Sequence, residues 1–196
     1  MFMVNELIKR NRSIRRFSQE TIPSIEQCRQ LVDLARKAPA TRNLQPLKYI
    51  ISTATATNQR IFSHVSWAGY LQNWDGPKEN EHPTAYIVIL HDSELSLPIH
   101  FVFCDAGLAS QNILLGATEM GFGGCILGSF NPITLQHSLE ISERYKPVLV
   151  VALGKPGEKV TLEETGPDGD IRYYRDNEDI HHVPKRPLSE LILYER

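Results

Sequence analysis

The sequence has no excess of positive charge and no long apolar run, and each absence excludes a class of protein. Its 196 residues include 21 Lys and Arg against 23 Asp and Glu, a formal net charge of -2. A broad nucleic-acid surface needs surplus cations to release counterions, so we expect no nucleic-acid partner. No stretch approaches the ~20 apolar residues that span a bilayer, so we expect no membrane segment.

Cysteine is also scarce. Cys28, Cys104 and Cys125 lie far apart and form no CxxC pair. A sparse, odd set is typical of a reducing compartment rather than of a disulfide framework. The start of the chain has neither the basic nor the apolar region of a signal peptide, so the sequence predicts a cytoplasmic protein. Apolar neighbours predict that Cys104 and Cys125 are inert core thiols.

The apolar pattern predicts an α+β layered fold in one domain, residues 1–196. The expected helices are 3–11, 24–38, 57–72, 101–121 and 132–141, and the expected strands are 49–53, 85–90, 125–128 and 148–153. Residues 73–84 are polar and rich in Gly and Pro, which predicts a long loop. Residues 157–196 are charged and poor in aliphatic side chains. We expect them to form an arm that packs on a partner subunit rather than a packed unit.

Two polar segments in the first quarter indicate a bound anionic cofactor. The segment 12–17, Arg-Ser-Ile-Arg-Arg-Phe, puts guanidinium groups and a hydroxyl close together, which suits a phosphate. The segment 38–46 is turn-forming, rich in amides and hydroxyls, and leads into an apolar run. Each segment alone would be read as a solvated helix end or an ordinary turn.

Four blocks, in this order, resemble the nitroreductase family of FMN-dependent oxidoreductases across nearly the whole chain. They are residues 12–17, 38–46, 105–125 and 151–156. The resemblance implies a nitroreductase-like fold: a central mixed sheet flanked by helices, in an intertwined homodimer with a C-terminal arm. The 101–121 helix would lie in the dimer core, and FMN would lie in the interface.

The resemblance also implies which residues hold FMN. The phosphate and ribityl end would contact Arg12 and Ser13, and Arg15 would lie by the pyrimidine edge. The segment 126–129 would pass the flavin, with a backbone N–H facing N5. Lys185 and Arg186 would complete the phosphate clamp, although an ordinary basic tail stays an alternative. The implied set is Arg12, Ser13, Arg15, Ile126, Leu127, Gly128, Ser129, Lys185 and Arg186 from one subunit, with Pro39, Ala40, Thr41 and Asn43 from the other.

The chain departs from the family at three positions. Asn11, Ala40 and Leu47 stand where the family often has Arg, Ser and Trp. The loss of a basic residue at Asn11 leaves more of the phosphate binding to Arg12 and to the C-terminal basic pair.

The implied activity is hydride transfer from NAD(P)H through flavin N5 to a small organic acceptor, such as a nitroaromatic or a quinone, by a ping-pong mechanism. No side chain need act as acid or base, so no catalytic residue is nominated. One alternative is a specialised member, a dehalogenase or a flavin-consuming enzyme, with the 73–84 loop selecting the acceptor. Another is a non-catalytic flavin-binding module.

Other patterns favour no site. The glycines of 121–124 end a helix and enter a strand, which is the wrong context for a dinucleotide fingerprint. His181 and His182 are adjacent, so their imidazoles diverge in an extended chain, and we expect two surface histidines rather than a metal site. Trp67, Tyr70 and Trp74 are expected in the core or in a lid over the flavin.

Overall fold

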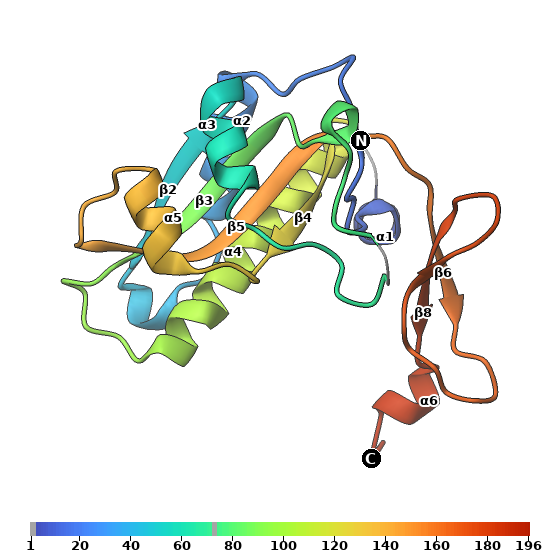
Figure 1. Cartoon of the computed structure of the whole chain (residues 1–196). Coiled ribbons are helices and arrows are strands. Elements are labelled where there is room, and N and C mark those ends of the chain that lie inside the picture. The colour runs from blue at the N-terminus through green and yellow to red at the C-terminus, as the bar shows by residue number, and fades with distance from the viewer. Residues whose placement is uncertain (1–2, 72–73) are drawn as a thin grey trace.

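The computed structural model describes residues 3–71 and 74–196, and its centre is a five-stranded sheet (Figure 1). The strand order is β1-β5-β3-β2, and β4 also pairs with β5. The strands are β1 (Phe17–Ser18), β2 (Leu47–Ser52), β3 (Ala85–Asp92), β4 (Gly123–Leu127) and β5 (Tyr145–Pro156). All four pairings in this sheet are antiparallel, whereas a mixed sheet was expected. The α+β class is confirmed.

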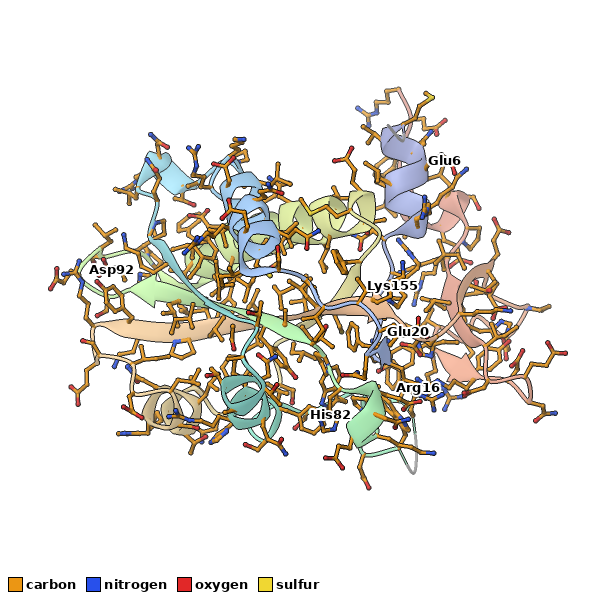
Figure 2. All side chains as sticks on the ribbon, turned by 90° about the horizontal axis from the view of Figure 1, so that it is seen from above. Glu6, Arg16, Glu20, His82, Asp92 and Lys155 are labelled. Carbon is orange, nitrogen blue, oxygen red and sulfur yellow. The ribbon has the colours of Figure 1, made fainter. Side chains whose placement is uncertain are left out.

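Helices cover both faces of the sheet. Figure 2 shows α2 and α4 on one side of it, and α3 and α5 on the other. The short α1 lies beside α4, and α6 precedes the C-terminal tail (Figure 1). The α-helices are α1 (Val4–Arg10), α2 (Ile25–Ala35), α3 (Thr55–Phe62), α4 (Ile99–Glu119), α5 (Pro132–Ser138) and α6 (Leu188–Leu191), and the 3-10 turns are η1 (Thr41–Asn43) and η2 (Glu79–Glu81).

Strand β3 shows why the apolar run at its centre is continuous. Ile87 and Ile89 pack in the core under α2 and α4, while Tyr86 and Val88 pack in the core under α3 and α5. All four side chains are fully buried because both faces of the strand are covered.

The helix expected over 57–72 is wrong in its second half. Helix α3 ends at Phe62, and Val65 then forms a β-bridge with Phe130. The backbone N–H of Ser66 also donates to the Ser129 carbonyl at 2.9 Å. Pairing with this segment after β4 replaces the helical hydrogen bonds. The expectations for residues 72 and 73 lie outside the described residues.

The segment after β5 was expected to form an arm that packs on a partner subunit, which stays a prediction, but the segment also contains a small sheet that the sequence did not indicate. Strands β6 (Val160–Glu164), β7 (Tyr174–Arg175) and β8 (His181–Lys185) form a second sheet in the order β6-β8-β7, with β6 and β8 parallel. Its side chains are joined by stacking and ion pairs rather than by aliphatic packing. Beyond it, Leu193 and Tyr194 are 83% and 81% exposed, and the tail extends away from the sheets (Figure 1).

The cysteines divide between core and surface. Cys28 and Cys125 are buried, and burial raises the pKa of both thiols, that of Cys28 to about 11. Cys104 is exposed on the outward side of α4, so its expected place in the core is wrong. Among the described helices, none combines the length and apolarity that a bilayer crossing requires.

Candidate functional site

A cavity of about 400 Å³ lies among α1, the segment after it, α4, β4 and the second sheet. Arg12, Arg15 and Lys185 bring cationic side chains to its wall, with Ser13 and Gln111 beside them. No carboxylate occurs among the described residues that line it. A concave site with several cations and no carboxylate is suited to an anionic ligand.

The segment from Arg12 to Arg15 is held on β4. Ser13 forms a β-bridge with Gly124, and the N–H of Ile14 donates to the Gly124 carbonyl at 2.9 Å. Ile14 is buried in the core, and because an extended chain alternates sides, its neighbours Ser13 and Arg15 face the cavity. The apolar residue in the middle of the polar segment therefore fixes its orientation.

Arg12 has no anionic partner among the described residues. Its Nη2 donates to the Ile8 carbonyl at 2.7 Å, while its Nε is buried and makes no hydrogen bond within the described part of the chain. Burial lowers the pKa of this guanidinium from its ordinary value. Partial burial of a cation with an unpaired donor costs free energy unless a bound anion accepts the hydrogen bond.

Arg15 reaches into the cavity and meets the second sheet. Its Nη1 lies 3.3 Å from the Ser13 carbonyl and 3.3 Å from His181 Nε2, and its guanidinium carbon is 4.9 Å from the centre of the Tyr173 ring. Burial first, and Arg15 second, lower the pKa of His181 to about 4, so its ring is neutral near pH 7. Arg15 can only donate, so Nε2 accepts and the proton is placed on Nδ1.

Both histidines differ from the surface residues that were expected. His181 is fully buried in the wall of the cavity. The ring of His182 lies between two carboxylates, with Nδ1 2.8 Å from Glu163 and Nε2 3.0 Å from Asp176. In residues 3–71 and 74–196, no group of three or more metal-binding side chains occurs. Nothing in the sequence signals the partners of either histidine.

Of the predicted segment 126–129, which begins on β4 and runs past its end, only the first residue lines the cavity. Ile126 lines the cavity, whereas Leu127 points into the core and is 5% exposed. Gly128 and Ser129 line a separate, open hollow of about 700 Å³ beyond the end of the strand. A side chain added at Gly128 would meet only Leu149, at 3.6 Å, so the chain's own packing does not require glycine there.

Only one residue of the C-terminal basic pair Lys185 and Arg186 lines the cavity. Lys185, at the end of β8, lines the cavity. Arg186 is exposed beyond the strand and is not among the residues of its wall. The proline-stiffened segment therefore delivers one of the two predicted cations.

Residues 39–43 lie elsewhere in the same chain. Pro39 and Ala40 line a smaller cavity of about 180 Å³, next to Asp105 and Tyr49. Along α4, Asp105 comes six to nine residues before Gln111 and Leu114 of the cationic cavity, which is roughly 9–14 Å at 1.5 Å per residue. Within one chain the two predicted groups do not meet.

Asp105 is a functional candidate that the sequence analysis did not assign. Its buried carboxylate accepts hydrogen bonds from the Thr41 N–H at 3.0 and 3.1 Å and from the Thr41 hydroxyl at 2.9 Å. These bonds hold a turn in which Arg42 and Asn43 have φ near +54° and +55°, a conformation rare for such residues. An acid among the apolar residues of this long helix was the signal that could have found it.

The aromatic residues Trp67, Tyr70 and Trp74 lie in different surroundings. Trp67 is buried in the core, and Tyr70 lies against Tyr173 of the second sheet with ring centres 5.1 Å apart. The ring of Trp74 lies under Arg175 at 4.6 Å. Tyr70, just before the 73–84 loop, and Trp74 within it thus both contact residues at or beside β7.

Comparisons with known proteins agree with this fold. The profile of the nitroreductase family matches residues 8–155. A Bacillus subtilis (strain 168) protein named provisionally as an NAD(P)H nitroreductase, YodC, is 24% identical over 76% of this chain and 88% of its own. Similar solved structures include a nitroreductase family protein from Streptococcus pneumoniae (TM-score 0.72, 18% identity, 98% and 100% of the two chains). Another is a nitroreductase-type protein from Desulfovibrio desulfuricans in complex with FMN (TM-score 0.73, 23% identity, 100% and 98%).

At these identities the solved structures establish the fold alone, but the profile covers most of the chain. With its antiparallel sheet, two helical layers and cationic cavity, the molecule has the architecture of an α+β oxidoreductase. The chain belongs to the nitroreductase family.

Proposed function

We propose that this protein is an FMN-dependent oxidoreductase that takes hydride from NAD(P)H and passes it to a small organic acceptor, such as a nitroaromatic or a quinone, in alternating half-reactions. The observation that carries the proposal is the cavity walled by Arg12, Arg15 and Lys185 with no carboxylate among its described residues. The FMN bound to the Desulfovibrio desulfuricans neighbour supports the choice of cofactor.

The residues of the cavity fit the phosphate of FMN. Arg12 has a buried Nε–H that no described residue accepts, and Lys185 brings a second cation from the end of β8. The Ser13 hydroxyl stands beside them and can donate to a phosphate or ribityl oxygen. The bound flavin would supply the hydride-accepting atom, and the protein binds and orients it.

Arg15 would act on the flavin ring rather than on the phosphate. It is held from three sides, by Ser13, His181 and Tyr173, so its charge has a fixed position. A fixed cation beside a flavin favours the anionic reduced form. His181 stays neutral near pH 7 and its Nε2 faces Arg15, so it orients Arg15 without adding charge to the wall.

We also propose that two copies of the single domain form the complete site. The outward side of α4 carries an apolar stripe of Phe101, Cys104 and Leu108, which leads to Gln111 at the cavity. Exposed apolar residues also follow β8, in α6 and the tail. A second copy on this stripe would cover it and would bring residues 39–43 to the flavin, which one chain alone does not do.

The test is to purify the protein, measure FMN per chain, and mix it anaerobically with NADH or NADPH. We expect the flavin absorbance to bleach and then to return when a quinone is added. Arg12→Ala should weaken FMN binding roughly tenfold to a hundredfold, since a charged hydrogen bond is lost. Arg29→Ala is the matched control, because Arg29 is exposed on α2 and pairs with Glu26.

Two outcomes would contradict the proposal in different ways. Protein that takes up no FMN when it is supplied in excess would exclude the cofactor. Protein that binds FMN tightly but shows no bleaching with either nicotinamide would be a non-catalytic flavin-binding module.

A further inference from the structure

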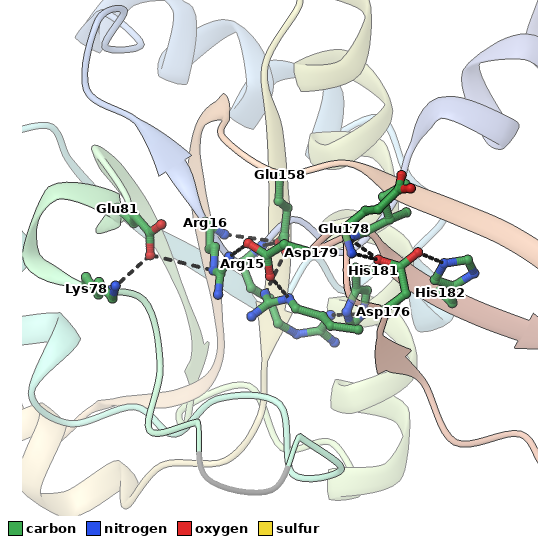
Figure 3. A network of polar contacts seen from close by, with 12 residues as sticks. Arg15, Arg16, Lys78, Glu81, Glu158, Asp176, Glu178, Asp179, His181 and His182 are labelled. Carbon is green, nitrogen blue, oxygen red and sulfur yellow. Dashed lines mark hydrogen bonds and ion pairs between the residues drawn. The ribbon is translucent and has the colours of Figure 1, made fainter.

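Two neighbouring arginines, Arg15 and Arg16, point to different places. Arg15 lies in the cationic cavity. The Arg16 guanidinium pairs with Asp179 after β7, and its Nε lies 3.6 Å from Glu81 of η2 (Figure 3). Of these two side chains, only Arg15 is therefore available to a ligand.

The carboxylate of Glu158 lies against the backbone of Arg15 and Arg16. Chain continuity brings it there, because β5 pairs with β1 up to Pro156 and the N–H of Gly157 donates to the Arg16 carbonyl at 2.9 Å. Glu158 Oε1 then accepts hydrogen bonds from the backbone N–H groups of both Arg15 and Arg16, the second at 3.1 Å. Two successive backbone N–H groups therefore converge on one carboxylate oxygen.

The other oxygen of Glu158 binds the second sheet. Oε2 accepts from Arg175 Nη2 at 2.8 Å, and the two side chains are only 2% and 11% exposed. A buried carboxylate is costly unless it is paired and hydrogen-bonded, and here both oxygens are used. Figure 3 shows Glu158 between the two arginines of the N-terminal segment and the turn that carries Asp176 and Asp179.

We propose that Glu158 is a positioning residue: it fixes the backbone at Arg15 so that the Arg15 guanidinium stays in the cofactor cavity, and it ties that position to the second sheet. The inference rests on the proposed function, because it takes the ligand of the cavity to be FMN. Glu158 does not line the cavity itself, so it acts through Arg15.

The decisive experiment compares FMN binding by apoprotein, followed by quenching of flavin fluorescence, in Glu158→Ala and Glu158→Gln. Loss of the charged acceptor should weaken FMN binding roughly tenfold to a hundredfold in the alanine variant. Glutamine keeps one acceptor oxygen and should restore part of the loss. Glu164→Gln, an exposed glutamate of β6, is the matched control and should bind FMN as the wild type does.

A merely structural role is separated by two further readouts. The midpoint potential of the FMN-saturated protein should fall in Glu158→Ala, in the same direction as in Arg15→Ala, because a cation has left the flavin. The double variant Arg15→Ala, Glu158→Ala should bind FMN within about twofold of Arg15→Ala alone, because both changes remove the same effect. An unchanged potential, or losses that multiply in the double variant, would overturn the inference.

A readout without flavin keeps this inference separate from the proposed cofactor. In apoprotein, hydrogen exchange at the Arg15 and Arg16 amides should be at least about tenfold faster in Glu158→Ala than in the wild type, because their acceptor is gone. A wild-type protein that does not bind FMN would refute the proposed function but not the role of Glu158 in holding the backbone. Amide exchange unchanged in folded Glu158→Ala would refute the role of Glu158, whatever the wild type binds.

Discussion

At the scale of single residues, the predicted cationic contacts Arg12, Arg15 and Lys185 share a cavity whose described wall contains no carboxylate. Among the residues that the structure describes, Arg12 has a buried donor without an acceptor, and Arg15 is held by a neutral histidine and an aromatic ring rather than by a carboxylate. Glu158, which is hydrogen-bonded to this segment, uses both carboxylate oxygens on backbone N–H groups and Arg175. The cavity therefore keeps its positive charge.

Glycine at position 124 is required by the packing of the sheet. A Cβ there would lie 2.3 Å from the Ala152 carbonyl oxygen, and rigid backbone cannot move aside. Gly124→Ala should destabilise the fold by about 3 kcal/mol or more, measured by urea unfolding. Gly128→Ala is the control, because its Cβ would meet only Leu149 at 3.6 Å, and its stability should equal that of the wild type. Equal stability of the two variants would contradict this packing.

At the scale of elements, the second sheet is joined by polar contacts instead of a core. His182 on β8 lies between Glu163 of β6 and Asp176 after β7, and it stacks on Tyr174 with ring centres 4.8 Å apart. A neutral imidazole has one N–H, so both contacts are hydrogen bonds only when the ring is protonated. The hydrogen bonds that the ring donates to Asp176 and then to Glu163 raise the pKa of His182 above its ordinary 6.5.

This cluster gives stability a definite dependence on pH. Because the pKa of His182 is raised in the folded state, its contribution is complete below pH 6.5 and is lost as the pH rises through the folded value. The thermal midpoint of the wild type should therefore fall between about pH 6 and about pH 8.5 more than that of His182→Gln. Parallel curves for the two proteins would show that the ring is not protonated in the folded state.

At the scale of the whole molecule, the exposed side of α4 is the feature that one chain leaves incomplete. Phe101 and Leu108 are 41% and 42% exposed, and they flank the free thiol of Cys104. If a second copy covers this stripe, the thiol is shielded in the native protein and the two halves of the flavin site meet.

Leu108→Glu should separate the copies by placing a charge in the apolar contact. We expect the wild type to sediment as a dimer whose Cys104 reacts slowly with a thiol reagent. The variant should sediment as a monomer, react at least about tenfold faster and lose FMN. Ile133→Glu, on the exposed side of α5, is the control and should behave as the wild type. A monomeric wild type with full FMN content would contradict the dimer.

Much of the architecture followed from local sequence. Continuous apolar runs placed the strands around Ile87 and Val151, and Ser24 begins α2 with the capping box that its spacing with Gln27 allows. The helix predicted through residue 72 failed because the partner of Val65 is Phe130, which is remote in sequence. Periodicity within a window carries no information on such pairing.

The sequence by itself determined the family through four blocks of resemblance, and it determined most helices and strands and the cluster of Arg12, Ser13 and Arg15 through composition and spacing within short segments. Only the tertiary structure decided that His181 is buried beside Arg15 and that Glu158 holds the backbone of two arginines. It also separated residues 39–43 from the cationic cavity. Burial and pairing arise from contacts between distant parts of the chain, and no local pattern encodes them.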